Sequence, residues 1–198
     1  MNSRPFLVLT ACLSVLVIAL SFYAWQLRKN AVPESGSAPQ LQAVAPPDRG
    51  AAKQVALCVA HDDSGVLRTQ SVSIPLSSER QQRAQEILRT LLVIYTAKDS
   101  PHPLPAGADV RNVFFVDPGL VVIDLNSELA SGNTSGVLDE ELTIASIIQT
   151  LSLNVEGVSR VKFLVDGKEA STLSGHADLS TAYDVSRVAI LAKQLSSP

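Results

Sequence analysis

The sequence predicts an α/β fold: a two-layer sandwich with a mixed or antiparallel sheet and two main helices on one face. Two segments, 84–95 and 138–151, carry apolar residues at the spacing of a helix face. Shorter apolar segments come in pairs joined by turn residues, which favours hairpins and antiparallel pairing. The expected element order is therefore β-β-α-β-β-α-β-β.

The first half of the folded part predicts two strands and a helix. Residues 54–60 form a short apolar strand, and after a turn at 61–65 the alternation resumes over 66–74. Ser78 and Gln81 have the spacing of a capping box, which favours a helix start there. The apolar stripe of that helix consists of Ala84, Ile87, Leu88, Leu91, Leu92 and Tyr95.

The second half predicts two more strands, a second helix and a further strand. Residues 110–116 and 120–125 alternate as strands, and the Asp-Pro-Gly sequence between them is a turn signal. A strand over 158–165 follows the second helix. Its expected inward side chains are Val161, Phe163 and Val165. The stripe of the second helix consists of Leu138, Leu142, Ala145, Ile148 and Leu151.

The N-terminal residues 6–27 contain no charged side chain and are mostly apolar. About 20 helical residues cross a hydrocarbon core of roughly 30 Å, so this segment is long enough to span a bilayer. A cleaved signal peptide is the weaker interpretation, because no small-x-small site follows the apolar run. The Leu-Thr-Ala-Cys sequence ending at Cys12 matches a lipobox, but too few apolar residues precede it. We predict an uncleaved signal anchor over residues 1–29.

Three further segments complete the predicted organisation. Residues 30–53 are rich in Pro, Ala, Ser and Gln, which predicts a disordered linker. Residues 54–180 then form one domain, a length that is ordinary for a single core. Residues 181–198 form a C-terminal tail, in which the helical spacing over 184–195 predicts a short final helix.

The overall charge and the cysteines narrow the classes of function. A formal net charge of -3 argues against nucleic-acid binding, which requires a basic surface. Cys12 lies in the apolar N-terminal run and Cys58 in a predicted strand, so we expect no disulfide between them. We therefore expect a partner other than a nucleic acid.

The histidines do not have the spacing of a metal or catalytic site. None of His61, His102 and His176 lies in a zinc-binding motif. We expect His61 and His102 to be solvent-facing or hydrogen-bonded loop residues. Ser174, His176 and Asp178 share one side of an extended chain, so their ends form a row instead of a triad. We expect no catalytic residue, no metal and no cofactor.

The carboxylates have structural interpretations of their own. Asp139, Glu140 and Glu141 crowd the start of the second predicted helix, where negative charge complements the helix dipole. Asp124 comes at the end of a predicted strand, and we expect it to cap the turn that follows.

Three stretches of the chain carry a family resemblance. They are VVIDLNSEL (121–129), SIIQTLSLNVEGVSRVKFLVDGK (146–168) and TLSGHADL (172–179). Their order and separation resemble the GerMN domain family of sporulation and germination proteins, over roughly residues 55–179. The resemblance implies an exported domain that acts as a binding or assembly module and has no assigned catalytic residues.

The predicted function follows from the anchor and the resemblance together. We expect a single-pass protein of the bacterial cytoplasmic (inner) membrane whose extracytoplasmic domain binds an envelope protein or cell-wall component, or associates with itself. Candidate binding or structural residues are Asp124, Asp166, Gly167, Gly175 and His176.

Two alternative functions remain open from the sequence alone. One is an envelope enzyme that uses Asp124, Asp166 and His176. The other is a small-ligand receptor that holds its ligand between the loop 101–107 and the helix faces.

Overall fold

The computed structural model describes residues 52–131 and 136–195. The chain divides into two units, Met1–Ala45 and Pro46–Pro198, and all described residues belong to the second. The predicted anchor over 1–29 and nearly all of the linker over 30–53 lie outside them. Within the described ranges, no helix is both long enough and apolar enough to cross a membrane.

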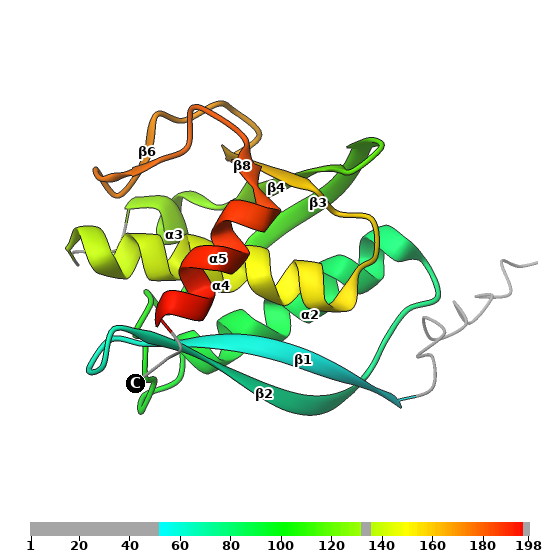
Figure 1. Cartoon of the computed structure of the whole chain (residues 1–198), viewed down its shortest axis with the longest axis horizontal. Coiled ribbons are helices and arrows are strands. Elements are labelled where there is room, and N and C mark those ends of the chain that lie inside the picture. The colour runs from blue at the N-terminus through cyan, green and yellow to red at the C-terminus, as the bar shows by residue number, and fades with distance from the viewer. Residues whose placement is uncertain (1–51, 132–135, 196–198) are drawn as a thin grey trace, which may run out of the picture. The chain divides into compact units, whose positions relative to one another are not determined.

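The described chain alternates strands and helices, and its fold class is the predicted α/β class (Figure 1). The elements are β1 (Ala52–His61), β2 (Val66–Pro75), α2 (Arg80–Tyr95), β3 (Val110–Asp117), β4 (Leu120–Leu125), α3 (Ser127–Ser131), α4 (Val137–Asn154), β5 (Arg160–Val165), β6 (Thr172–Leu173), β7 (Ala177–Asp178), β8 (Tyr183–Asp184) and α5 (Val185–Leu195). The predicted C-terminal helix is present as α5.

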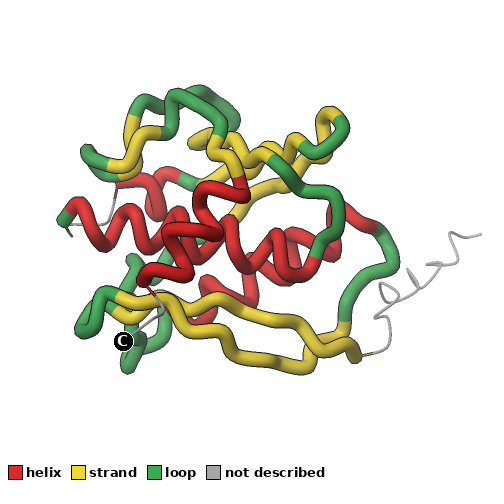
Figure 2. The backbone as a smooth tube through the Cα atoms, viewed as in Figure 1, coloured by secondary structure: helices red, strands yellow, loops and turns green. Residues whose placement is uncertain are grey.

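The strands form three sheets where we expected one. Strands β1 and β2 pair only with each other, and β6 pairs with β7. The main sheet has the order β3-β4-β5-β8, with β4 and β5 parallel. Helix α4 makes this parallel pair possible, because a parallel connection needs a long crossover. The segment between β5 and β8 is mostly loop (Figure 2). Periodicity predicts strands but does not say which strands pair.

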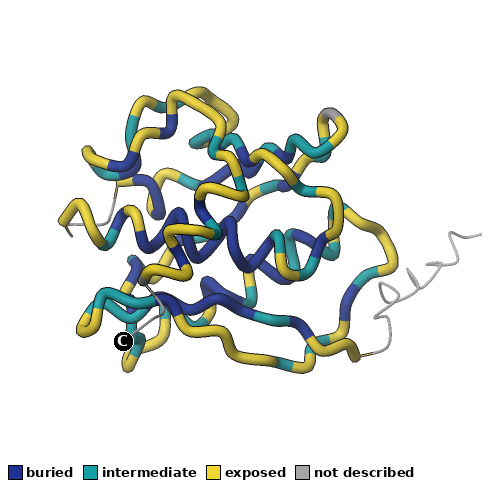
Figure 3. The backbone as a smooth tube through the Cα atoms, in the orientation of Figure 1, coloured by how far each residue is buried: buried dark blue, intermediate teal, exposed yellow. Residues whose placement is uncertain are grey.

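Helices α2 and α4 lie between the β1–β2 hairpin and the main sheet (Figure 1). Every residue of the predicted α2 stripe is buried. Helix α4 is buried over most of its surface (Figure 3), because it packs against β1, β2, α2, α5 and β7. Its predicted stripe is buried except for Leu138, which is 47 % exposed. In β5, Val161 and Phe163 are buried, and Val165 is partly buried against the core.

The predicted capping box is absent. Helix α2 begins at Arg80, and its N-cap residue Glu79 makes no side-chain cap bond. The hydroxyl of Ser77 instead accepts a hydrogen bond from the Glu79 N–H at 3.1 Å. The spacing of Ser78 and Gln81 was correct for a helix start, but the helix begins one position later than the motif requires.

One edge of β1 is closed by side chains instead of by a strand. The backbone N–H of Ala56 donates to Oδ1 of Asn154 at 3.0 Å, and its carbonyl accepts from Nδ2 of the same amide at 2.7 Å. Hydroxyls accept hydrogen bonds from the next two N–H groups on that edge. These bonds join Cys58 to Thr150 at 2.9 Å and Ala60 to Tyr95 at 2.8 Å. Helices α2 and α4 thus satisfy backbone groups that burial would otherwise leave unpaired.

The turn between β3 and β4 requires glycine at position 119. Its φ is +81°, and a Cβ there would lie 2.2 Å from Oγ of Ser159. Its carbonyl accepts hydrogen bonds from the N–H groups of Ser159 and Arg160, each at 2.8 Å. This turn therefore holds the chain that leads into β5.

Replacing Gly119 with alanine should lower the free energy of unfolding by about 2 kcal/mol, through backbone strain and displacement of Ser159. Chemical denaturation of the two proteins measures it. Gly167→Ala is the matched control, since Gly167 also has positive φ but has open space around its Cβ position. An equal loss of unfolding free energy in both variants would mean that the contact between the new Cβ and Ser159 does not destabilise the fold.

Candidate functional site

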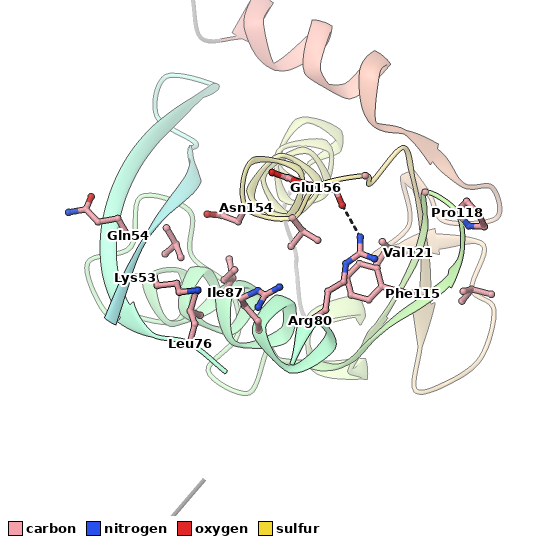
Figure 4. Close-up of a pocket in the computed structure, with 16 residues that line it drawn as sticks. Lys53, Gln54, Leu76, Arg80, Ile87, Phe115, Pro118, Val121, Asn154 and Glu156 are labelled. Atoms are coloured by element: carbon pink, nitrogen blue, oxygen red, sulfur yellow. Dashed lines mark hydrogen bonds between the residues drawn. The ribbon is translucent and has the colours of Figure 1, made fainter. Parts of the chain in front are cut away.

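A cleft of about 1100 Å³ opens at one end of the domain (Figure 4). One wall is the start of β1 with Lys53 and Gln54, and another is the β3–β4 turn region with Phe115 and Val121. The first half of α2 and the C-terminal end of α4 provide the remaining surface. Apolar side chains from β1, α2 and the β3–β4 region line it beside a few charged groups, and Val155 adds one just after α4.

Basic side chains dominate the charge of this cleft. Lys53 comes from β1, whereas Arg80 and Arg83 come from α2, where a spacing of three places them on one side of the helix. Glu156 is the one acidic residue among the described residues that line the cleft. Counting formal charges, three positive groups face one negative group. The cleft is therefore suited to an anionic ligand.

The arginines are positioned by contacts that leave their charge uncompensated. The Cζ atom of Arg80 lies 4.0 Å from the centroid of the Phe115 ring, and its Nη2 donates to the carbonyl of Glu156 at 2.8 Å. Nη1 of Arg83 donates to the carbonyl of Ser78 at 3.1 Å. Within the described ranges, neither guanidinium nor Lys53 forms an ion pair with a carboxylate. Arg80 in particular is held in place with donors to spare.

The chemistry of the lining favours binding over catalysis. The described residues that line the cleft include no His, Cys, Ser or Asp, and they provide a single carboxylate. General acid–base and nucleophilic catalysis need a nucleophile or a proton-transfer group beside a partner. These lining residues can hold a charged group but offer no such pair.

Three of the predicted candidate residues come together elsewhere, around Arg111. Oδ1 of the buried Asp124 accepts from the N–H of Gly167 at 2.7 Å. Nη1 of Arg111 lies 2.7 Å from Oδ1 of Asp166, and its Nε lies 3.7 Å from Oδ2 of Asp124. The hydrogen bond from Arg111 lowers the pKa of Asp166 below its ordinary value. The cluster fastens the turn after β5 to β3 and β4.

We expected Asp124 to cap the turn that follows it, but it does not. Asn126 does so: its Oδ1 accepts from the N–H of Leu129 at 3.1 Å, at the start of α3. The parallel pairing of β4 and β5 brings the distant Gly167 beside Asp124 instead.

Gly175 and His176 belong to a second cluster, built on Glu140. Gly175 has φ +122°, a conformation that suits glycine, and the chain turns there between β6 and β7. Nδ1 of His176 lies 2.8 Å from Oε1 of Glu140, and the N–H groups of His176 and Ala177 both donate to Oε2 at 2.9 Å. The Glu140 side chain is fully buried. The sequence predicts only a helix-dipole role for Glu140, because its partner His176 is 36 positions away.

The electrostatics of Glu140 follow from these contacts. Burial raises the pKa of its carboxyl, but the hydrogen bonds from the His176 side chain and from the N–H groups of Ala177 and His176 outweigh burial. The pKa is therefore lowered overall. A charged carboxylate is the stable form in the folded domain.

The row of Ser174, His176 and Asp178 does not act as a triad. Oγ of Ser174 donates to the carbonyl of Ala130 at 2.9 Å, and Oδ1 of Asp178 accepts from Ser180. Each of the three side chains thus has a different partner. Within the described part of the chain, no hydrogen bond or ion pair joins the Glu140 cluster to the Arg111 cluster.

His102 forms the closest approach to a catalytic arrangement, but it is buried. Its Nδ1 lies 2.5 Å from Oδ1 of Asp62, and its Nε2 lies 2.7 Å from Oγ1 of Thr143. Only 1 % of His102 is exposed, and Thr143 is fully buried and donates to the carbonyl of Asp139. A buried hydroxyl cannot meet a substrate. His102 is a hydrogen-bonded loop residue, one of the two outcomes expected for it, and not a solvent-facing one.

The loop 101–107, which the sequence suggested as one side of a receptor site, packs against the end of α2. Leu104 is 8 % exposed, and its N–H donates to the carbonyl of Tyr95 at 2.9 Å. The loop contributes no described residue to the cleft. In the described ranges, no group of three or more His, Cys, Asp or Glu residues could hold a metal ion.

One family model and two solved structures resemble this chain. The family model Germane, described as sporulation and spore germination, matches residues 57–171. The tandem GerMN domains of the sporulation protein GerM from Bacillus subtilis share 20 % identity, with a TM-score of 0.53, over 68 % of this chain and 46 % of that chain. The first GerMN domain of the same protein gives 19 % identity and a TM-score of 0.48, over 65 % and 94 %. A comparison with curated proteins finds no match.

Proposed function

Since this chain belongs to the Germane family of sporulation and spore germination proteins, we propose that its GerMN-like domain is a non-catalytic binding module of the cell envelope. The basic cleft is the surface that holds the partner, either an envelope protein or a cell-wall component. The uncompensated charge of Lys53, Arg80 and Arg83 is the observation that carries this proposal.

Positive charges held close together raise the free energy of the domain unless a ligand of opposite charge balances them. Like charges on neighbouring side chains repel each other, and stacking on Phe115 restricts the freedom of the Arg80 side chain. Apolar wall residues beside the charges add a hydrophobic contribution for a ligand larger than an ion. This mixed surface is typical of binding sites.

An envelope enzyme is less well supported. Asp124, Asp166 and His176 already accept or donate hydrogen bonds that hold loops in place, and they lie in two clusters. A fold-supporting carboxylate is poorly suited to proton transfer, because protonation would break the contacts it makes.

The proposed location is the outer side of a bacterial cytoplasmic membrane, with residues 6–27 as the anchor and 30–53 as the linker. The apolar length of 6–27 and the composition of 30–53 support this part of the proposal. A linker of this composition would let the domain reach a partner at some distance from the bilayer.

Site-specific photo-crosslinking in the full chain tests the proposed function. A photoreactive residue at Val116, which lines the cleft and is 62 % exposed, should yield one defined crosslinked species in the cells that make the protein. The substitution Arg83→Gln should abolish that species without changing the melting temperature.

The control is a photoreactive residue at Arg68, an exposed position on β2 that does not line the cleft. Equal crosslinking from both positions, or a product that survives Arg83→Gln, would contradict the cleft as the binding surface.

A further inference from the structure

The end of β1 that enters the cleft has an open backbone edge beside the basic side chains. From this juxtaposition we propose that the cleft binds an extended, acidic peptide segment, which adds to β1 as a further strand. This inference rests on the proposed function and specifies its partner class. It depends on the backbone of Gln54, on the cations Lys53 and Arg83, and on the length of the cleft.

The backbone groups of β1 point alternately toward β2 and away from it. Alternate residues of an antiparallel strand direct their N–H and C=O groups away from the paired strand. The groups of Ala56, Cys58 and Ala60 point away from β2, because side chains from α2 and α4 bind them. Gln54 has the same parity as these three residues. Its N–H and C=O therefore point to the same edge.

The side chains that bind the outer edge of β1 do not extend to Gln54. Asn154 is the last residue of α4, and its amide binds the N–H and C=O of Ala56. Within residues 52–131 and 136–195, no hydrogen bond reaches the backbone N–H or C=O of Gln54 on that edge. Gln54 lines the cleft and lies two residues before Ala56, whose backbone Asn154 binds. A peptide could continue where the helix stops, with the same hydrogen-bond pattern that Asn154 makes.

The positive charge of the cleft favours an acidic peptide. Lys53 and Arg83 have no carboxylate partner in the described ranges, and Arg80 extends the basic surface toward Phe115. Strand side chains that face one side recur every second residue, about 6.6 Å apart, so acidic residues at alternate positions could each meet a cation. A basic or neutral peptide would lack this complementarity.

The size of the cleft favours a peptide over a small anion as the ligand. A volume of about 1100 Å³ far exceeds that of a phosphate or acetate ion, and much of the wall is apolar. A single ion would leave the exposed Val116 and the partly exposed Phe115 uncovered. An extended peptide fills the length of the cleft, pairs with Gln54 and places alternate apolar side chains on that wall.

The test uses the full chain, purified in a neutral detergent, and a display library of random seven-residue peptides. We expect enrichment of peptides with Asp or Glu at alternate positions. The best peptide is then resynthesised with each backbone nitrogen methylated in turn, and its affinity is measured by calorimetry. Methylation should weaken binding about tenfold or more at one position only, because the peptide N–H at that position would lose its hydrogen bond to the free carbonyl of Gln54.

Matched charge variants complete the test. Lys53→Gln and Arg83→Gln should each weaken the enriched peptide about tenfold, whereas Arg68→Gln, the same kind of change on β2, should have no effect. Enrichment of basic or neutral peptides, or a methylation profile in which no single position weakens binding, would overturn the inference. If the library yields no ligand while Val116 still gives its crosslink, the peptide class is wrong and the binding function stands. If both fail, the proposed function fails with it.

Discussion

Replacing Glu140 with glutamine is expected to lower the free energy of unfolding by about 3 kcal/mol, among the largest effects of any single polar substitution in this domain. The carboxylate is fully buried and receives three hydrogen bonds, from the His176 side chain and from two backbone N–H groups. The amide of glutamine keeps the shape but replaces one accepting oxygen with an NH₂ group. At least one donor would then be buried without an acceptor.

The loss should depend on pH in a defined direction. The folded-state pKa of Glu140 is lowered from its ordinary value of 4.5. Its contribution is therefore fully present above about pH 4.5 and is lost as pH falls through the folded pKa. Denaturant unfolding of wild type and Glu140→Gln, measured from pH 7 down to about pH 3, should show the difference between them shrinking at the acid end.

Glu141→Gln is the control for Glu140. It removes the same charge one residue along α4, at an exposed position, so its effect should stay within about 0.5 kcal/mol. A difference between wild type and Glu140→Gln that stayed constant over the whole pH range would show that the Glu140 charge is not what stabilises the β6–β7 loop.

Tyr95→Ala is expected to cost about 3–5 kcal/mol, the other large effect. The ring is fully buried and meets the ring of His102 edge to face, with centroids 4.7 Å apart. The hydroxyl accepts from the N–H of Ala60 at 2.8 Å and donates to Oγ of Ser146 at 2.9 Å. Burial raises the pKa of Tyr95 well above its ordinary value, so the neutral hydroxyl persists at high pH.

Tyr95→Phe separates the hydroxyl from the ring. It should cost about 1–3 kcal/mol, because the N–H of Ala60 would be buried without a partner. Thermal and denaturant unfolding of both variants give the two contributions. If Tyr95→Phe were neutral, water would have replaced the hydroxyl, and the edge of β1 would be less tightly closed at that point than the structure indicates.

The helices and strands were predictable because the residues that show apolar periodicity in the sequence are the ones that the fold buries. All six stripe residues of α2 are buried, and the inward positions Val161 and Phe163 of β5 are buried as predicted. The prediction that Leu138 is buried was wrong. Leu138 lies in the first turn of α4, beyond the part of the helix that the core covers. Periodicity identifies a face but not where burial along that face begins.

The pairing of strands and the clusters of polar residues were not predictable from one sequence. Asp124 and Gly167 are 43 positions apart, and only the parallel register of β4 and β5 brings them together. Glu140 lies 36 positions from His176, and a dipole interpretation already accounted for an acid at a helix start. Asp166 and Gly167 were found because an Asp-Gly turn has a local signature, whereas their partner Arg111 has none.

The cleft was missed for the same reason. Lys53 comes from β1, Arg80 from α2 and Glu156 from the turn after α4, and no two of them are close in sequence. In the sequence, each looks like an ordinary surface charge. Only the packing of α2 and α4 between the hairpin and the sheet brings them to one cleft. The one local signal was the spacing of Arg80 and Arg83, which by itself describes a common solvent-facing side of a helix.

The closure of the β1 edge by α4 has a consequence for the order in which the protein is made. Asn154 reaches Ala56 across 98 positions of sequence, so the ribosome releases the whole β1–β2 hairpin well before its partner exists. During that interval the nascent hairpin presents an apolar strand with unsatisfied amides, the kind of surface that aggregates or recruits chaperones. Such distant contacts also slow the search for the native state. The edge of β1 can therefore be closed, and the hairpin protected from aggregation, only after residue 154 has been translated.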